Sequence, residues 1–147
     1  MIPLRRAVPG AEGAHLHPGL VPWRAAVCAS TDACMLLAAD TRIVAVAPAA
    51  RDLLGLPLEV EAAKPRFLRC GLDFLDFTAA AQPLRDAELA RLAPVQALQT
   101  DALERSLIRL DRGGVHRTFD VVASPLHSPP QLDAIGALAF FTPVGPG

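Results

Sequence analysis

The order of hydrophobic and polar positions predicts a chain that combines strands with short helices. Residues 33–39 and 135–141 are apolar throughout, which is typical of strands covered on both faces, although the Ala and Leu content of the first run would also suit a helix. Residues 43–46 are mostly β-branched and follow a polar turn, so they are expected to form the returning strand of a hairpin. Residues 115–124 alternate between apolar and polar side chains and predict a strand with one buried face.

Prolines and glycines mark the expected helices. A helix should begin at Pro48, because a first turn tolerates the missing N–H, and should end at Gly55. A longer helical stretch follows Pro83, and Pro94 is expected to kink or end it. Residues 23–29 have apolar positions at helical spacing and predict a short helix near the N-terminus.

The C-terminal part is expected to consist of three strands. Gly113 and Gly114 permit positive φ and predict a tight turn between residues 106–110 and the alternating strand. A polar loop, residues 127–133, then leads to the last apolar run. Two strands, a helical middle and three strands together predict an antiparallel α+β domain.

Length and composition favour one folded domain. The chain has 147 residues, of which 52% are hydrophobic, and this is enough for one core and too few for two ordinary domains. Residues 1–22 are rich in Pro and Gly without hydrophobic periodicity and are interpreted as a flexible leader. Residues 23–144 then form the expected domain, and residues 145–147 form a short tail.

Charge and cysteine content narrow the class of protein. The 14 Lys and Arg residues oppose 15 Asp and Glu residues without a basic run, so nucleic acid is not an expected partner. The N-terminus lacks the apolar stretch of a signal peptide, and the longest apolar runs are too short for a membrane span, which predicts a cytoplasmic protein. Cys28, Cys34 and Cys70 are expected to be buried thiols, with a redox pair of Cys28 and Cys34 as the alternative if the fold brings them together.

Two parts of the sequence resemble the PAS family. Residues 40–55, DTRIVAVAPAARDLLG, are similar to the acidic turn, second strand and Asn-x-Ala-x-x-x-Leu-x-Gly helix of the family, except that Ala47 replaces the Asn. The family's closing hairpin and last strand are matched by residues 109–114, by Ser124-Pro125-Leu126 and by residues 135–141.

The resemblance covers residues 23–144 and implies a five-stranded antiparallel sheet with helices on one face and a short N-terminal helix. It also implies a sensory domain of bacterial type in signal transduction, which binds a small ligand or a partner protein and is not an enzyme. A ligand-free interaction scaffold is the alternative. A small α+β enzyme or a thiol-based redox sensor is a more distant one.

No cofactor or metal is expected. A haem-binding version of the family would need an axial ligand, yet no His occurs between His17 and His116. The flavin-photoreceptor motif Gly-x-Asn-Cys-Arg-Phe-Leu-Gln is not matched, because residues 66–70 place the cysteine last and lack the Asn and the Gln. His15 and His17 have no third ligand nearby, so a metal site is not predicted.

No catalytic residue is predicted either. The sequence contains no Gly-x-Ser-x-Gly elbow, no His-Glu-x-x-His pair and no phosphate-binding glycine-rich loop. Asp73 and Asp76 are three residues apart, but such pairs usually act as solvated or capping groups, and we interpret them in this way.

By resemblance, a ligand pocket would lie between the inner face of the sheet and the central helices. With few polar anchors, such a pocket would take an apolar or aromatic ligand, or none. The residues expected to line it are Phe74, Phe77, Leu89, Ile108, Phe119 and Val121.

A homodimer is also predicted. The two runs that are apolar on both faces need a cover on the side away from the central helices, and residues 23–29 or a second chain must supply it. The alternative is that this short helix covers only its own sheet. A separate signalling protein is the other partner considered. The residues expected at the dimer contact are Trp23, Val27, Met35 and Leu138.

Overall fold

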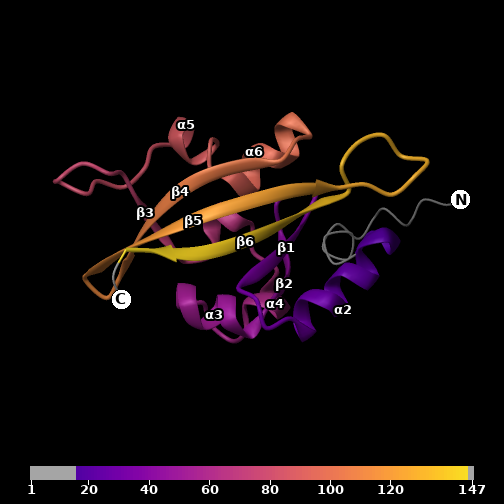
Figure 1. Cartoon of the computed structure of the whole chain (residues 1–147), viewed down its shortest axis with the longest axis horizontal. Coiled ribbons are helices and arrows are strands. Elements are labelled where there is room, and N and C mark those ends of the chain that lie inside the picture. Colours follow the sequence, from indigo (N-terminus) through magenta and orange to yellow (C-terminus); the bar gives the residue numbers. More distant parts are fainter. Residues whose placement is uncertain (1–15, 146–147) are drawn as a thin grey trace, which may run out of the picture.

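The computed structural model describes residues 16–145 and is built on one antiparallel sheet of six strands in the order β2-β1-β6-β5-β4-β3 (Figure 1). The strands are β1 (Cys34–Ala38), β2 (Ile43–Val46), β3 (Asp73–Leu75), β4 (Glu104–Arg112), β5 (Val115–Leu126) and β6 (Gly136–Val144). The predicted α+β class with an antiparallel sheet is confirmed, whereas the expected number of five strands is wrong. The additional strand is β3, which pairs with β4 and is too short to show a hydrophobic period.

The closing hairpin forms as the sequence predicts. β4 and β5 pair up to Arg112 and Val115, and the turn residues Gly113 and Gly114 have φ values of 60° and 87°. Glycine adopts such angles without strain because it lacks a Cβ. β6 then pairs with both β5 and β1, so the first and last strands of the chain are neighbours in the sheet.

Helices cover the two faces of the sheet unequally (Figure 1). The helices are η2 (Pro18–Leu20), α2 (Val21–Ala29), α3 (Pro48–Leu54), α4 (Val60–Ala63), η3 (Phe67–Arg69), α5 (Asp86–Leu89) and α6 (Ala93–Thr100). Those from α3 to α6 pack around the larger core cluster on one face, where α6 contacts β4, β5 and β6. On the opposite face, α2 contacts β1 and β2. Within residues 16–145, no helix is long and apolar enough to cross a membrane.

α3 begins and ends where the sequence predicts. Pro48 lies in its first turn, and Gly55 ends it in the left-handed conformation with a φ of 76°. Ala47 offers no side chain to cap the helix. Its N–H instead donates to the Cys34 carbonyl oxygen at 2.9 Å, which fixes the start of α3 to β1.

The middle of the chain differs from the prediction of one longer helix. Two short helices, α5 and α6, form after Pro83, and Pro94 lies in the first turn of α6 instead of ending a helix. Proline loses no helical hydrogen bond at this position. The Ala93 N–H donates to the Ser106 Oγ at 2.9 Å, so the start of α6 is fixed to β4.

β1 is buried on both faces. Met35 and Leu37 belong to the larger core cluster, whereas Cys34 and Leu36 belong to a second cluster under α2. None of the four residues exposes more than 3% of its surface. The predicted strand with two covered faces is therefore confirmed, and α2 of the same chain provides the second cover.

The folded part of the chain begins before Trp23. The helical turn η2 precedes α2, and Leu20 is fully buried in the cluster under α2. The predicted leader is therefore too long, because residues 16–22 belong to the domain. The other residues of the predicted leader, 1–15, and the tail residues 146–147 lie outside the described residues.

We expect Gly136→Ala to destabilise the fold strongly. A Cβ at this position would lie 2.4 Å from the Leu37 carbonyl oxygen and 3.0 Å from the Leu20 Cδ2. Strand backbone and a fully buried side chain have little room to move, so the free energy of unfolding should fall by about 3 kcal/mol in urea denaturation. Gly71→Ala is the control: its φ is 92° and nothing lies within 4 Å, so backbone strain alone should cost about 1 kcal/mol. Equal losses in the two variants would contradict this packing.

Candidate functional site

Most of the predicted pocket residues fill the core instead of lining a cavity. Ile108, Phe119 and Val121 expose 2% of their surface or less and pack in the larger core cluster on the side of α6. Phe74 is also buried, and its ring centroid lies 5.4 Å from that of Phe67. The space between the sheet and the central helices is therefore occupied by the side chains that were expected to surround a ligand.

Two predicted pocket residues lie near the surface. Leu89 on α5 is half-buried and lines, together with Phe74, a depression of about 420 Å³ beside β3. Phe77 is 56% exposed in the loop after β3 and does not line this depression. The structure thus brings Phe74 and Leu89 together and separates them from Phe77.

Two of the predicted dimer contacts are buried inside the chain. Met35 has no exposed surface, and Val27 is 2% exposed where α2 packs on the sheet. Neither side chain can reach a second chain in this fold, so the prediction is wrong for these two residues. Trp23 is 39% exposed on α2, and Leu138 is half-buried on β6.

A row of exposed and half-buried apolar side chains lies where α2 does not cover the sheet. Leu107, Val122 and Phe140 lie on the neighbouring strands β4, β5 and β6, on the face opposite to the larger core cluster. Leu107 is 51% exposed and Phe140 is 40% exposed. An exposed apolar surface on a folded chain often marks contact with another molecule. We call this surface the open face; it comprises Arg105, Leu107, Asp120, Val122, Phe140 and Val144.

One ion pair lies within the open face. The Arg105 guanidinium donates from Nε and Nη2 to the two Asp120 carboxylate oxygens, at 2.9 and 2.5 Å. The pairing lowers the pKa of Asp120 and raises that of Arg105, so both groups stay charged at neutral pH. The open face therefore presents apolar side chains beside one balanced pair of charges.

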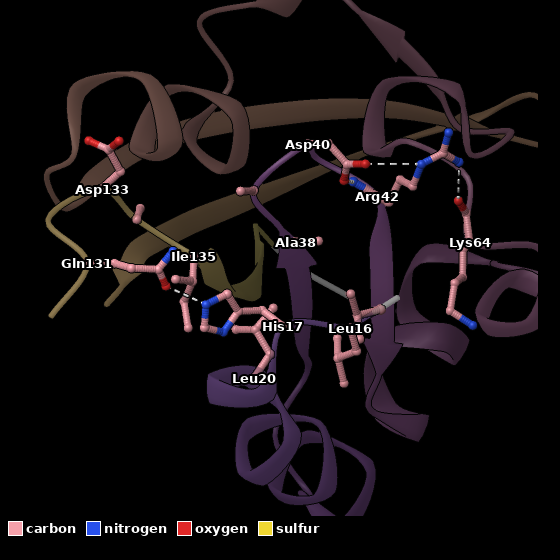
Figure 2. Close-up of a pocket in the computed structure, with 13 residues that line it drawn as sticks. Leu16, His17, Leu20, Ala38, Asp40, Arg42, Lys64, Gln131, Asp133 and Ile135 are labelled. Atoms are coloured by element: carbon pink, nitrogen blue, oxygen red, sulfur yellow. Dashed lines mark hydrogen bonds and ion pairs between the residues drawn. The ribbon is translucent and has the colours of Figure 1, made fainter. Parts of the chain in front are cut away.

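A separate pocket of about 310 Å³ lies beside η2, on the side of the sheet that α2 covers (Figure 2). We call it the η2 pocket. It is formed by η2, the end of β1, the start of β2 and the loop before β6. Its apolar lining packs in or against the cluster under α2. The lining residues of this kind are Leu16, Leu20, Ala38, Val44 and Ile135.

One rim of the η2 pocket is formed by His17 and by the loop before β6 (Figure 2). The Gly19 N–H donates to the His17 Nδ1 at 2.9 Å, so the proton of the neutral ring belongs on Nε2, which donates to the Gln131 Oε1. The ring is therefore held from both sides. Asp133 adds a carboxylate to the same rim.

The opposite rim carries Asp40, Arg42 and Lys64 (Figure 2). Arg42 Nε donates to the Asp40 Oδ2 at 3.2 Å, and Arg42 Nη1 donates to the Lys64 carbonyl oxygen at 3.1 Å. In the part of the chain that the structure describes, the Arg42 Nη2 and the Lys64 ammonium have no hydrogen-bond or ion-pair partner. Lys64 is also the only lysine in the sequence.

The three cysteines are free thiols. Cys34 and Cys70 are buried as predicted, whereas Cys28 is exposed on α2, with its Sγ 3.9 Å from the Glu61 Oε2. Burial raises the pKa of Cys70 to about 11, and partial burial together with the Glu61 carboxylate raises that of Cys28. A raised pKa keeps a thiol protonated, which disfavours a thiol-based redox sensor.

Asp76 organises the loop after β3. Its Oδ1 accepts from the Thr78 hydroxyl at 2.6 Å, and from the backbone N–H groups of Thr78 and Gln82 at 3.1 and 3.2 Å. These hydrogen bonds lower the pKa of Asp76.

Among residues 16–145, no group of three or more His, Cys, Asp or Glu side chains is placed to hold a metal ion.

Solved structures with the same fold are PAS and LOV domains. The PAS domain of a protein from Colwellia psychrerythraea matches with a TM-score of 0.56 and 16% identity, over 85% of this chain and 97% of that chain. The Rhodobacter sphaeroides LOV protein matches with a TM-score of 0.60 and 18% identity, over 85% of this chain and 66% of that chain. The PAS domain of an HTR-like protein from Haloarcula marismortui matches with a TM-score of 0.50 and 18% identity, over 95% of this chain and 98% of that chain. No family model and no curated protein matches the sequence. The chain therefore has a PAS-like fold, as its sequence predicts.

Phe119→Trp is expected to lower the free energy of unfolding by about 1 to 3 kcal/mol, because a larger ring cannot fit a filled core without displacing its neighbours. Phe77→Trp is the matched control, since Phe77 is 56% exposed. It should change stability by less than about 0.5 kcal/mol. Urea denaturation measures both. A Phe119→Trp protein as stable as the wild type would show unfilled space beside Phe119 and would restore the internal pocket predicted from the sequence.

Proposed function

We propose that this chain is a sensory domain of signal transduction that acts as a homodimer through its open face. The PAS-like fold supports a sensory role. The observation that carries the proposal is the apolar row of exposed Leu107, half-buried Val122 and exposed Phe140, on a sheet whose opposite face is covered by helices. In this proposal the dimer passes its signal to a separate signalling protein.

A second copy of this chain fits the charge of the open face. In a two-fold symmetric contact, each patch meets an identical patch, so the patch must be complementary to itself. The apolar rows can pack against each other, and the Arg105 and Asp120 side chains of each protomer offer opposite charges to those of the other. The net charge of −1 leaves little repulsion between two copies.

Two of the four contacts predicted from the sequence lie on the same side of the sheet as the open face. Trp23 is exposed on α2 and Leu138 is half-buried on β6, on the same side of the sheet as the open face. Phe140 and Leu107 take the place of the buried Val27 and Met35. The expected dimer thus remains a proposal, with a contact centred on β4, β5 and β6 instead of β1.

The filled core favours contact with a protein over a ligand held between the sheet and the central helices. A ligand in that position would have to displace Ile108, Phe119 or Val121, which are all but fully buried. Each of these side chains gains about 1.5 to 3 kcal/mol from burial, and displacing it would forfeit that gain. The interaction role is therefore the better-supported part of the proposed function.

Phe140→Asp and Leu107→Glu are each expected to weaken self-association. Either substitution places a carboxylate in the apolar row, where burial in the contact would remove its hydration. The dimer dissociation constant should rise at least about tenfold, as sedimentation velocity over a range of protein concentrations can measure.

The matched control is Phe77→Asp, because Phe77 is an exposed phenylalanine outside the open face. It should leave the dissociation constant unchanged, and circular dichroism should show that all three variants fold. A wild-type protein that stays monomeric at every concentration would contradict the proposal, and so would a dimer that tolerates both open-face substitutions.

A further inference from the structure

The η2 pocket lies apart from the open face and has the features of a small-molecule site. Its volume of about 310 Å³ is at the lower end of the range that ligand pockets occupy. Such pockets combine a mostly apolar lining with a few polar groups that orient the ligand. Seven apolar residues line the η2 pocket, and polar side chains stand on two opposite rims (Figure 2).

The apolar lining is held in place from behind. Leu20 is fully buried, Ile135 is 5% exposed and Val44 is 7% exposed, and all three belong to the cluster under α2. The His17 ring is fixed by hydrogen bonds with Gly19 and Gln131. A ligand would therefore enter a site that is already formed, which reduces the entropy lost on binding.

The two rims carry opposite unpaired charges. At one rim, the Asp40 carboxylate is already paired with Arg42, so the Lys64 ammonium and the Arg42 Nη2 are left to attract an anion. At the other rim, Asp133 has no ion-pair partner within residues 16–145. Figure 2 shows Asp133 and Lys64 on opposite sides of the pocket. An anionic ligand would be attracted by the rim of Lys64 and Arg42 and repelled by the rim of Asp133, so its orientation is determined.

We propose that the η2 pocket binds a small apolar or aromatic carboxylate, with its carboxylate at Lys64 and Arg42 and its apolar body on Ala38, Val44 and Ile135. Arg42 and Lys64 belong to the same rim, and the Arg42 Nη2 or the Lys64 ammonium can each donate a charge-assisted hydrogen bond to a carboxylate oxygen. A neutral analogue would keep the apolar contacts and lose these bonds. An amine of the same shape would meet two like charges at this rim.

Lys64 offers a direct spectroscopic probe because it is the only lysine in the sequence. Reductive methylation with ¹³C-formaldehyde keeps its positive charge and labels only Lys64 and the N-terminal amine. The full-length protein is then titrated with phenylacetate, with phenylacetamide as the neutral analogue and phenethylamine as the cationic one. We expect phenylacetate to shift the Lys64 methyl signal in a saturable manner. Lys64→Gln identifies that signal, because it removes it.

Two substitutions separate the charge of the site from its shape. Lys64→Gln should raise the dissociation constant of phenylacetate about tenfold and leave weak phenylacetamide binding unchanged, as calorimetry or backbone amide shifts would measure. Ala38→Phe should fill the pocket and abolish binding of both compounds. Arg85→Gln is the control, because this 88% exposed side chain stands beside α5, which packs toward the other face of the sheet.

Several results would overturn the proposal. One is that phenylacetamide binds as tightly as phenylacetate. Another is that Lys64→Gln weakens the binding of both compounds equally, which would indicate a structural effect. Absence of any Lys64 shift, as expected if another part of the chain already occupied the pocket, would overturn it too. Sedimentation of the same samples reports the dimer independently, so failure of the pocket and failure of the open face are distinguishable.

Discussion

Burial of β1 on both faces is the constraint on which the rest of the fold depends. Five consecutive apolar residues, Cys34–Ala38, cannot leave one face to water without exposing a continuous apolar strip. The larger core cluster covers Met35 and Leu37, and the cluster under α2 covers Cys34 and Leu36. The sheet must therefore be covered on both sides at β1, although the helices from α3 to α6 already form a complete layer on one side.

The shortness of α2 then determines where the sheet stays open. A helix of nine residues spans about 14 Å, since each residue adds 1.5 Å, and it covers β1 and β2 while β4, β5 and the far part of β6 remain exposed. β4 and β5 differ from β1 in their sequence pattern. Their open side carries both polar and apolar residues, and Arg105 pairs with Asp120 there. The open face and the η2 pocket both lie next to the part of the sheet that α2 and η2 cover.

The parts of the fold that were predictable are those that a local pattern determines. Proline and glycine bound α3, and the glycine turn and the alternating strand define the last hairpin. β3 was missed because three residues show no period, and α6 was misjudged because Pro94 can either end a helix or begin one. The start of the domain was also misplaced, although Leu16, Leu20 and Val27 have helical spacing, because the prolines and glycines around them favoured a loop.

The candidate sites were harder to predict because they depend on volume and on contacts between distant segments. An aromatic side chain at the centre of the fold can line a cavity or fill it, and only the packing of Phe119 against its neighbours decides that it fills it. The η2 pocket brings together His17 and Gln131, which are more than a hundred residues apart in the sequence. Its wall is nevertheless continuous with the proposed contact surface, because Leu20 and Ile135 pack in the same cluster as Leu138, two residues from Phe140 on β6. The η2 pocket and the edge of the open face therefore rest on one close-packed cluster.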